Sequence, residues 1–208
     1  MSPDLIVLQV FILLLGLTIH EFGHAWVADR MGDPTPRAMG RVTLNPLAHI
    51  DPIGTVVFPL VLIFLKSNFL FGWAKPVPIN PAFIRSRHGH LLISFAGAAG
   101  NIVLAVILGI TGRFLPLLGN TTITLYLEYF CFLGVSLNLI LAIFNLIPIP
   151  PLDGGHIAME LLPKQYSDAL ARIEPFGFII IIVLFQLDVL DKVLFPLVRF
   201  GRLLLLGA

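Results

Sequence analysis

The sequence has few charged residues. Only 12% of its 208 residues are Asp, Glu, Lys or Arg, whereas 57% are hydrophobic. A water-soluble domain usually carries about 25% charged residues, so this composition excludes an ordinary soluble domain. There is no surplus of either charge, because 13 Lys and Arg stand against 12 Asp and Glu. Without a basic surface to bind phosphates, nucleic acid is not an expected partner.

Cysteine is almost absent. Cys131 is the single cysteine and lies in an apolar run, so the chain has no disulfide framework and no dithiol redox site. We expect a buried thiol that packs as a small hydrophobic side chain. A basic segment is also missing before the first apolar run, where Asp4 precedes Leu5. We therefore expect this run to stay in the protein rather than act as a signal peptide.

What the sequence does contain is a series of uncharged apolar stretches, most of them of helical length. They predict an all-α polytopic membrane protein with about four transmembrane helices. The stretches are Leu5–Ile19, which runs on through His20–Ala28, then Pro52–Leu65, Leu91–Gly112, Tyr129–Leu152 and Pro175–Leu187. Because Pro52–Leu65 is short and contains Pro59, we expect a re-entrant or interfacial segment that returns to the side it left. Val193–Leu206 carries Arg199 and Arg202 among apolar residues, which favours a C-terminal interfacial helix.

The segments between these stretches are typical of extended loops. Asp29–Asp51 and Pro76–His90 are rich in Pro, Gly, Arg and His. Neither has the composition of a separate folded domain. We therefore expect one domain over residues 1–208, without the internal repeat that many transporters show.

Two histidines and a glutamate end the first apolar run, where the sequence reads His20-Glu21-Phe22-Gly23-His24. Residues four apart share one face of a helix, so His20 and His24 are spaced to bind one Zn²⁺. Glu21 can deprotonate or orient a water molecule. His20 lies about 22 Å along a helix from Leu5, inside a hydrocarbon core of about 30 Å. Polar residues are costly at that depth, so we favour a zinc site over the alternative, a helix end emerging into water.

A catalytic zinc normally has three protein ligands, so a third ligand is needed. The acidic candidates in or beside apolar runs are Asp51, Glu128, Asp153, Glu174 and Asp188. Only Asp153 follows an unusual backbone, with three prolines between Asn145 and Asp153 and two glycines directly after. A broken helix at membrane depth is tolerated where it is buried in protein or lines a water-filled cavity. The alternative is an interfacial turn in which Asp153 caps the next helix.

With these two motifs in order, the chain resembles the site-2 protease family of intramembrane zinc metalloproteases. The first signature is His20–His24, and the second is Asn145…Pro148…Leu152-Asp153-Gly154. Asn45–Pro52 and Gly72–Pro78 resemble the compact prokaryotic branch, which lacks a soluble regulatory module. The chain departs from the family's Ala-Gly-Pro-x-x-Asn motif, because residues 96–101 read Ala-Gly-Ala-Ala-Gly-Asn.

The resemblance implies a role for each motif residue. His20, His24 and Asp153 would be the ligands of one Zn²⁺ per chain, Glu21 the general base, and Asn145 a polar group at the reacting carbonyl. The implied activity is hydrolysis of a peptide bond within or next to a transmembrane segment of a membrane-protein substrate. Substrate selection would then rest on the membrane part of the chain or on a separate regulatory protein.

Charge places the site relative to the membrane. Arg30, Arg37 and Arg41 follow the first span, and no Lys or Arg precedes it. Since positive residues favour the cytoplasmic side, we expect the N-terminus outside and the zinc site inside the cell membrane, nearer its cytoplasmic face. Asp153 must reach the same zinc, so the span that precedes it should also run inward.

Several other polar residues have two interpretations. His49 and Asp51 either support the metal ligands or belong to a plain turn. His156 follows the glycines after Asp153 and either neighbours the site or only begins a helix. Asn101 is expected to make one interhelical hydrogen bond beside the small residues of its span.

The segment that contains Trp73, Val77 and Ile79 also has two interpretations. Its alternation is compatible with a strand edge that an extended substrate could pair with. Equally, Trp73 could be an interfacial anchor.

Two other functions would use the same residues. A metal-ion transporter could use the His and Asp side chains as a transit site, but it predicts paired broken helices in two related halves. A proteolytically inactive relative could only bind membrane proteins. Such a protein has no use for a buried base such as Glu21, so we favour the protease.

Overall fold

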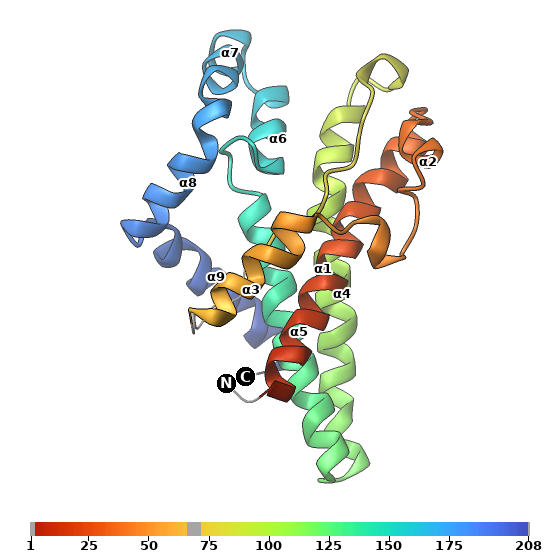
Figure 1. Ribbon diagram of the computed structural model, residues 1–208, viewed down its shortest axis with the longest axis vertical. Coiled ribbons are helices and arrows are strands. Elements are labelled where there is room, and N and C mark those ends of the chain that lie inside the picture. Colours follow the sequence, from red (N-terminus) through yellow and green to blue (C-terminus); the bar gives the residue numbers. More distant parts are fainter. Residues whose placement is uncertain (1–2, 66–71, 208) are drawn as a thin grey trace.

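The computed structural model describes residues 3–65 and 72–207, and every regular element in these two ranges is helical. Figure 1 shows an elongated bundle in which the long helices lie side by side. The α-helices are α1 (Pro3–Arg30), α2 (Thr35–Ala38), α3 (Phe58–Phe64), α4 (Gly89–Phe114), α5 (Thr122–Asn145), α6 (Asp153–Leu161), α7 (Lys164–Ile173), α8 (Gly177–Gln186) and α9 (Val189–Leu206). Helices α1, α4 and α5 are long and apolar enough to cross a membrane. The prediction of an all-α polytopic membrane protein is confirmed.

Helices α1 and α4 are antiparallel and pack closely beside the His20–His24 motif. A Cβ added to Gly23 would lie 2.5 Å from the carbonyl oxygen of Ala96. Only a residue without a side chain allows the two backbones to approach this far. Gly100 meets Ile19 in the same interface. The small residues of both helices therefore bring the histidines against α4.

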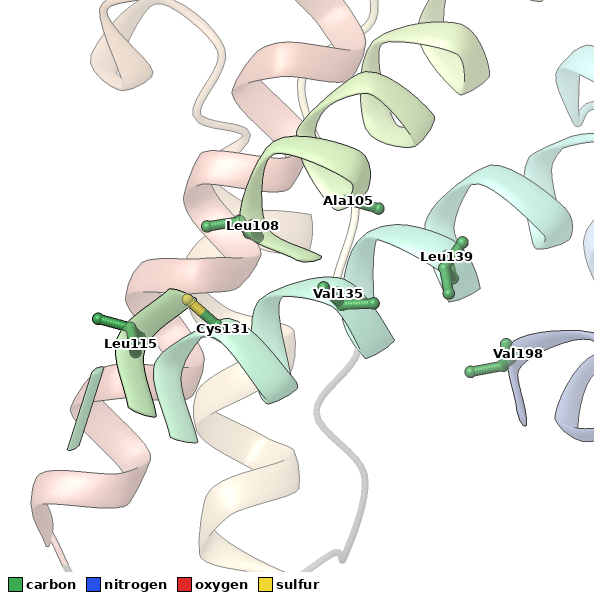
Figure 2. Close-up of a cluster of buried hydrophobic side chains, with 7 residues drawn as sticks. All are labelled: Ala105, Leu108, Leu115, Cys131, Val135, Leu139 and Val198. Carbon is green, nitrogen blue, oxygen red and sulfur yellow. The ribbon is translucent and has the colours of Figure 1, made fainter. Parts of the chain in front are cut away.

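The core of the bundle lies between α4, α5 and α9 (Figure 2). It contains Ala105 and Leu108 from α4, Val135 and Leu139 from α5, and Val198 from α9. Cys131 is buried in the same cluster, which agrees with the expected packing role of its thiol.

The segment Pro52–Leu65 forms a π-helical turn, Pro52–Val57, followed by α3. Beyond the undescribed residues 66–71 the chain is again next to the start of this segment. The amide of Trp73 donates to the carbonyl of Gly54, and the amide of Lys75 donates to that of His49. The chain that resumes at residue 72 therefore lies beside the start of this segment.

The C-terminal region differs from the expected fourth span and interfacial helix. Within Pro175–Leu187, α8 is only 10 residues long, about 15 Å, and Asp188 turns the chain in a left-handed conformation with φ 55°. Helix α9 does not lie apart from the bundle. Its Leu205 packs on Gly109 of α4, and Arg113 of α4 donates hydrogen bonds to its last carbonyls. Helices α8 and α9 together thus extend from the Asp153 end of α5 to the opposite end of the bundle.

Candidate metal centre

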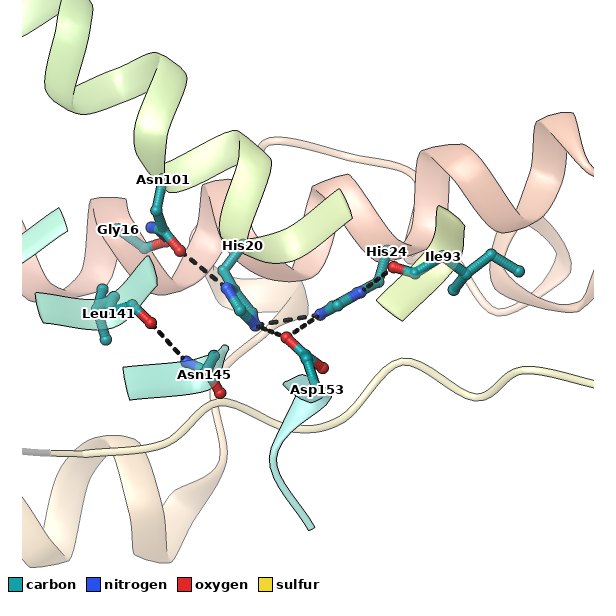
Figure 3. Close-up of polar contacts among 8 residues, drawn as sticks. All are labelled: Gly16, His20, His24, Ile93, Asn101, Leu141, Asn145 and Asp153. Atoms are coloured by element: carbon teal, nitrogen blue, oxygen red, sulfur yellow. Dashed lines mark hydrogen bonds and ion pairs between the residues drawn. The ribbon is translucent and has the colours of Figure 1, made fainter. Parts of the chain in front are cut away.

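The structure brings together His20 and His24 from α1 and Asp153 from the first turn of α6 (Figure 3). The Nε2 atoms of the two histidines are 3.1 Å apart. Oδ2 of Asp153 lies 3.2 Å from Nε2 of His20 and 3.3 Å from Nε2 of His24. Both histidines are buried. Among the described residues, this is the one group of His, Cys, Asp or Glu that could hold a metal ion.

The spacing of these three atoms fits zinc. Ligand atoms about 2.0–2.1 Å from a tetrahedral Zn²⁺ lie about 3.3–3.4 Å from each other. The three observed distances, from 3.1 to 3.3 Å, are close to this value. The fourth tetrahedral position is then left for water or substrate.

Hydrogen bonds on the far sides of the rings direct the Nε2 lone pairs to the centre. Nδ1–H of His24 donates to the carbonyl of Ile93, at 2.7 Å, and a carbonyl can only accept. Nδ1–H of His20 donates to Oδ1 of Asn101, at 2.8 Å. A neutral imidazole with its proton on Nδ1 has its lone pair on Nε2, as a metal ligand requires. Oδ2 of Asp153 is buried without a hydrogen-bond donor, so three acceptors converge on one point.

The orientation of the Asn101 amide is itself fixed. Its Nδ2 donates to the carbonyl of Gly16 and to Oδ1 of Asn138, both at 2.9 Å. Asn138 is completely buried and donates in turn to Gly134. With the NH₂ group used in this way, the oxygen of Asn101 must face His20. The expectation is one interhelical hydrogen bond, and Asn101 makes three, of which one reaches the candidate ligand His20 directly.

Gly97 leaves the space in which an ion would sit. A Cβ added to this residue would lie 2.4 Å from Nε2 of His24 and 2.7 Å from Nε2 of His20. Such a carbon would take the place between the two nitrogens. The absence of a side chain at Gly97 thus keeps the α4 side of the centre open.

The broken segment after α5 positions Asp153. Gly154 and Gly155 pack so tightly on the preceding turn that a Cβ on either would lie 2.3 Å from backbone atoms of Leu146 or Pro150. The N-cap of α6 is Leu152. Asp153 is therefore not the cap of this helix, which was the alternative interpretation, and its carboxylate points to the histidines instead.

Glu21 and Asn145 lie close to this centre in different ways. Glu21 is half-buried and follows His20 directly on α1. Asn145 is the last residue of α5 and lies beside His20 and Asp153 in Figure 3. Its Nδ2 donates to the carbonyl of Leu141 at 2.9 Å. Because an amide NH₂ has two hydrogens, one remains for another acceptor.

The other candidates serve the loops rather than the centre. Nε2 of His49 donates to the carbonyl of Thr43, and the carboxylate of Asp51 accepts from the amides of Ile53 and Gly54. The interpretation of these two residues as parts of a turn is confirmed. His156 lies exposed on α6.

Sequence reasoning missed Asn138 and the role of Gly97. An asparagine within an apolar span is costly unless it has a partner, and this cost is the signal that could have marked Asn138. No comparable signal marks Gly97, because small residues occur throughout α4.

Trp73 is half-buried and packs against neighbouring residues. Its indole would collide with a Cβ on Gly54, and its ring lies 5.3 Å from that of Phe58. The residue after it, Ala74, packs against Leu17 of α1 and Leu141 of α5. The described part of this segment therefore passes directly beside the centre.

Comparisons with known proteins show the family to which the chain is related. The profile of peptidase family M50 matches residues 117–185. A Bacillus subtilis protein whose name describes a zinc metalloprotease, YwhC, is 38% identical over 93% of this chain and 86% of its own length. The part of this chain that the alignment leaves out is shorter than the stretch before His20. The alignment therefore includes the His20–His24 motif as well as Asp153.

Two mycobacterial relatives, both named as the zinc metalloprotease Rip2, are also similar. The Mycolicibacterium smegmatis protein is 35% identical and the Mycobacterium tuberculosis H37Rv protein 31% identical, each over 89% of this chain and 69% of the relative. No solved structure gives a significant match. From the profile match and these relatives, the chain belongs to peptidase family M50, the site-2 protease family.

Proposed function

We propose that this chain is an intramembrane zinc metalloprotease that hydrolyses a peptide bond within or next to a transmembrane segment of another membrane protein. The observation that carries this proposal is the convergence of three buried ligand atoms at the spacing of a tetrahedral zinc site. Membership in a family of metallopeptidases and the three helices long enough to span a membrane support it.

His20, His24 and Asp153 hold one Zn²⁺ per chain in this proposal. Bound there, the ion supplies a Lewis acid that polarises the scissile carbonyl and makes water a stronger acid. Glu21 takes a proton from the attacking water and passes it to the leaving amine. The remaining amide hydrogen of Asn145 donates to the carbonyl oxygen as negative charge develops on it.

The two other functions have weaker support. Transport of a metal ion needs a succession of sites along a path, and the described residues contain a single candidate group. A protein that only binds other membrane proteins needs neither a directed pair of imidazoles nor a half-buried Glu21 beside them.

We infer one functional domain over residues 1–208, in contact with the lipid bilayer and with a membrane-protein substrate. Substrate selection then rests on the membrane part or on a separate regulatory protein. The centre lies in the cell membrane nearer the cytoplasmic face, because Arg30, Arg37 and Arg41 follow the end of α1 that carries the histidines.

The test is co-expression with a panel of single-span membrane proteins. The wild-type chain should truncate at least one of them, and Glu21→Gln should leave the same protein intact while expressed at the same level. Truncation that persists with Glu21→Gln, or that occurs with neither protein, would contradict the proposal.

A further inference from the structure

The described residues that follow the α3 segment, 72–80, have no helix or strand and run past the centre as an extended chain (Figure 3). Ala74 is buried against Leu17 and Leu141. Leu17 lies one turn before His20 on α1, and the carbonyl of Leu141 binds the amide of Asn145. Any backbone that approaches the centre between α1 and α5 therefore passes this segment.

The backbone of this segment is held by hydrogen bonds to the neighbouring loops. The amide of Trp73 donates to Gly54, and the carbonyl of Trp73 accepts from the hydroxyl of Thr55. At its far end, the amide of Asn80 donates to the carboxylate of Asp33 at 2.6 Å. The segment is thus tied to the loops at several points along its length.

Arg41 binds the carbonyls of the two residues that follow Ala74. Its side chain is buried, and its guanidinium donates hydrogen bonds to the carbonyls of Ala48, Lys75 and Pro76, the last at 2.7 Å. One side chain therefore fixes both the segment that contains Ala48 and the segment that contains Lys75 and Pro76. Only a guanidinium offers so many donors in a planar fork.

The positive charge of Arg41 is buried, which costs free energy. A buried cation is unfavourable unless it is paired and hydrogen-bonded. In the described residues, Arg37 forms an ion pair with the carboxylate of Asp29. Arg41 has carbonyl partners instead. A neutral contact would hold the two loops together at a lower cost. Unlike such a neutral contact, the guanidinium of Arg41 imposes a fixed geometry on Lys75 and Pro76.

From these contacts we propose that Arg41 is a positioning residue for the substrate. Its hydrogen bonds fix the backbone of residues 74–76 beside the path of the substrate. An extended substrate must lie along this path to bring its carbonyl to the centre. This inference rests on the proposed protease function. Arg41 touches none of the three candidate ligands, so it acts on substrate binding rather than on zinc.

Arg41→Gln removes the fork, and Arg37→Gln is the matched control, since Arg37 lies four residues earlier, on α2, with its side chain on the surface. With a cleaved single-span protein as probe, Arg41→Gln should raise KM roughly tenfold or more and leave kcat within about twofold. Zinc content should stay at one per chain. Arg37→Gln should behave as the wild type. If Arg41→Gln does not fold, Arg41→Lys retains the charge and should show a smaller rise in KM.

Cross-linking measures the same effect without proteolysis. In a Glu21→Gln, Cys131→Ala background, Val77→Cys should form a disulfide with a cysteine placed in the transmembrane segment of the single-span probe. Arg41→Gln should reduce the yield severalfold, and guanidinium ions added to an Arg41→Ala protein should restore part of it.

An unchanged KM and cross-link yield in Arg41→Gln, or a loss of zinc with KM unchanged, would overturn the role of Arg41. An Arg41-dependent cross-link from Val77→Cys, together with a wild-type chain that never cleaves the probe, would contradict the protease function and leave the positioning role standing. Absence of any cross-link from Val77→Cys would overturn the placement of the substrate beside this segment.

Discussion

Nδ1 of His20 on α1 lies 2.8 Å from Oδ1 of Asn101 on α4. This contact joins residues 81 positions apart in the sequence and determines which nitrogen of the imidazole faces the centre. The amide group of Asn101 is fixed by two further acceptors. The ligand set is therefore prepared by α4 and α5 before an ion binds.

We expect Asn101→Leu to weaken zinc binding by about 10- to 100-fold, the usual effect of removing a partner of a ligating histidine. Asn138→Leu should cost less, because the carbonyl of Gly16 still orients Asn101. Competition with a chelator of known affinity measures both. Equal affinity in Asn101→Leu and the wild type would show that the contact has no role in metal binding.

Substitutions of the candidate ligands and of Glu21 should differ in their effect on zinc content. His24→Ala and Asp153→Ala are expected to lose zinc, since each removes one of three ligands. Glu21→Gln should keep one zinc per chain and lose cleavage, because an amide cannot accept the proton. Atomic absorption on the purified proteins, beside a cleavage assay, measures both properties. A Glu21→Gln protein that cuts at nearly the wild-type rate would rule out Glu21 as the base.

Asn145→Ala is expected to retain stoichiometric zinc and to lose roughly 10²–10³ in kcat, the usual cost of one oxyanion donor. The basis is its position at the end of α5, with one amide hydrogen bound to Leu141. Steady-state kinetics on the probe and zinc analysis are needed together. If lower zinc content is the only defect, Asn145 supports the ligands instead.

Gly97→Ala should lower zinc content strongly, because the new methyl group would lie 2.4 Å from Nε2 of His24. Gly100→Ala on the same helix is the control. Its methyl group would meet Ile19 at 3.1 Å, which requires only a small adjustment. Full zinc occupancy in Gly97→Ala would mean that α4 can move away from the histidines.

The orientation in the membrane can be tested with single cysteines in a Cys131→Ala background. Ser86→Cys, at the end of the bundle near the centre, should react only with reagents that enter the cytoplasm. Asn120→Cys, in the turn between α4 and α5, should react with an impermeant reagent added outside. The reverse pattern would invert the proposed topology.

The sequence was sufficient to predict the elements whose signals are local. The spacing of His20 and His24 on one helical face predicts a shared ligand site, and the prolines and glycines around Asp153 predict a break at membrane depth. Both motifs meet in the structure. The apolar length of α1, α4 and α5 likewise predicts spanning helices.

The features that could not be predicted depend on how the helices rotate against each other. Asn138 can bind Asn101 only when α4 and α5 present these faces to one another, and no local pattern encodes that rotation. The end of α8 is a second example. The turn is made by Asp188 in a left-handed conformation, where Gly would be the usual signal.

Two of the candidate ligands come from the start of the chain and the third from residue 153. Zinc bound there joins the first helix to residue 153, so in the folded protein it closes a chain loop of more than a hundred residues. The ion therefore contributes to folding as well as to chemistry, since it binds a site that the unfolded chain does not offer. Removing it would break the link between α1 and α6 through the ion, while the packing of α4 on both helices remains, and the protein would lose its reactive centre.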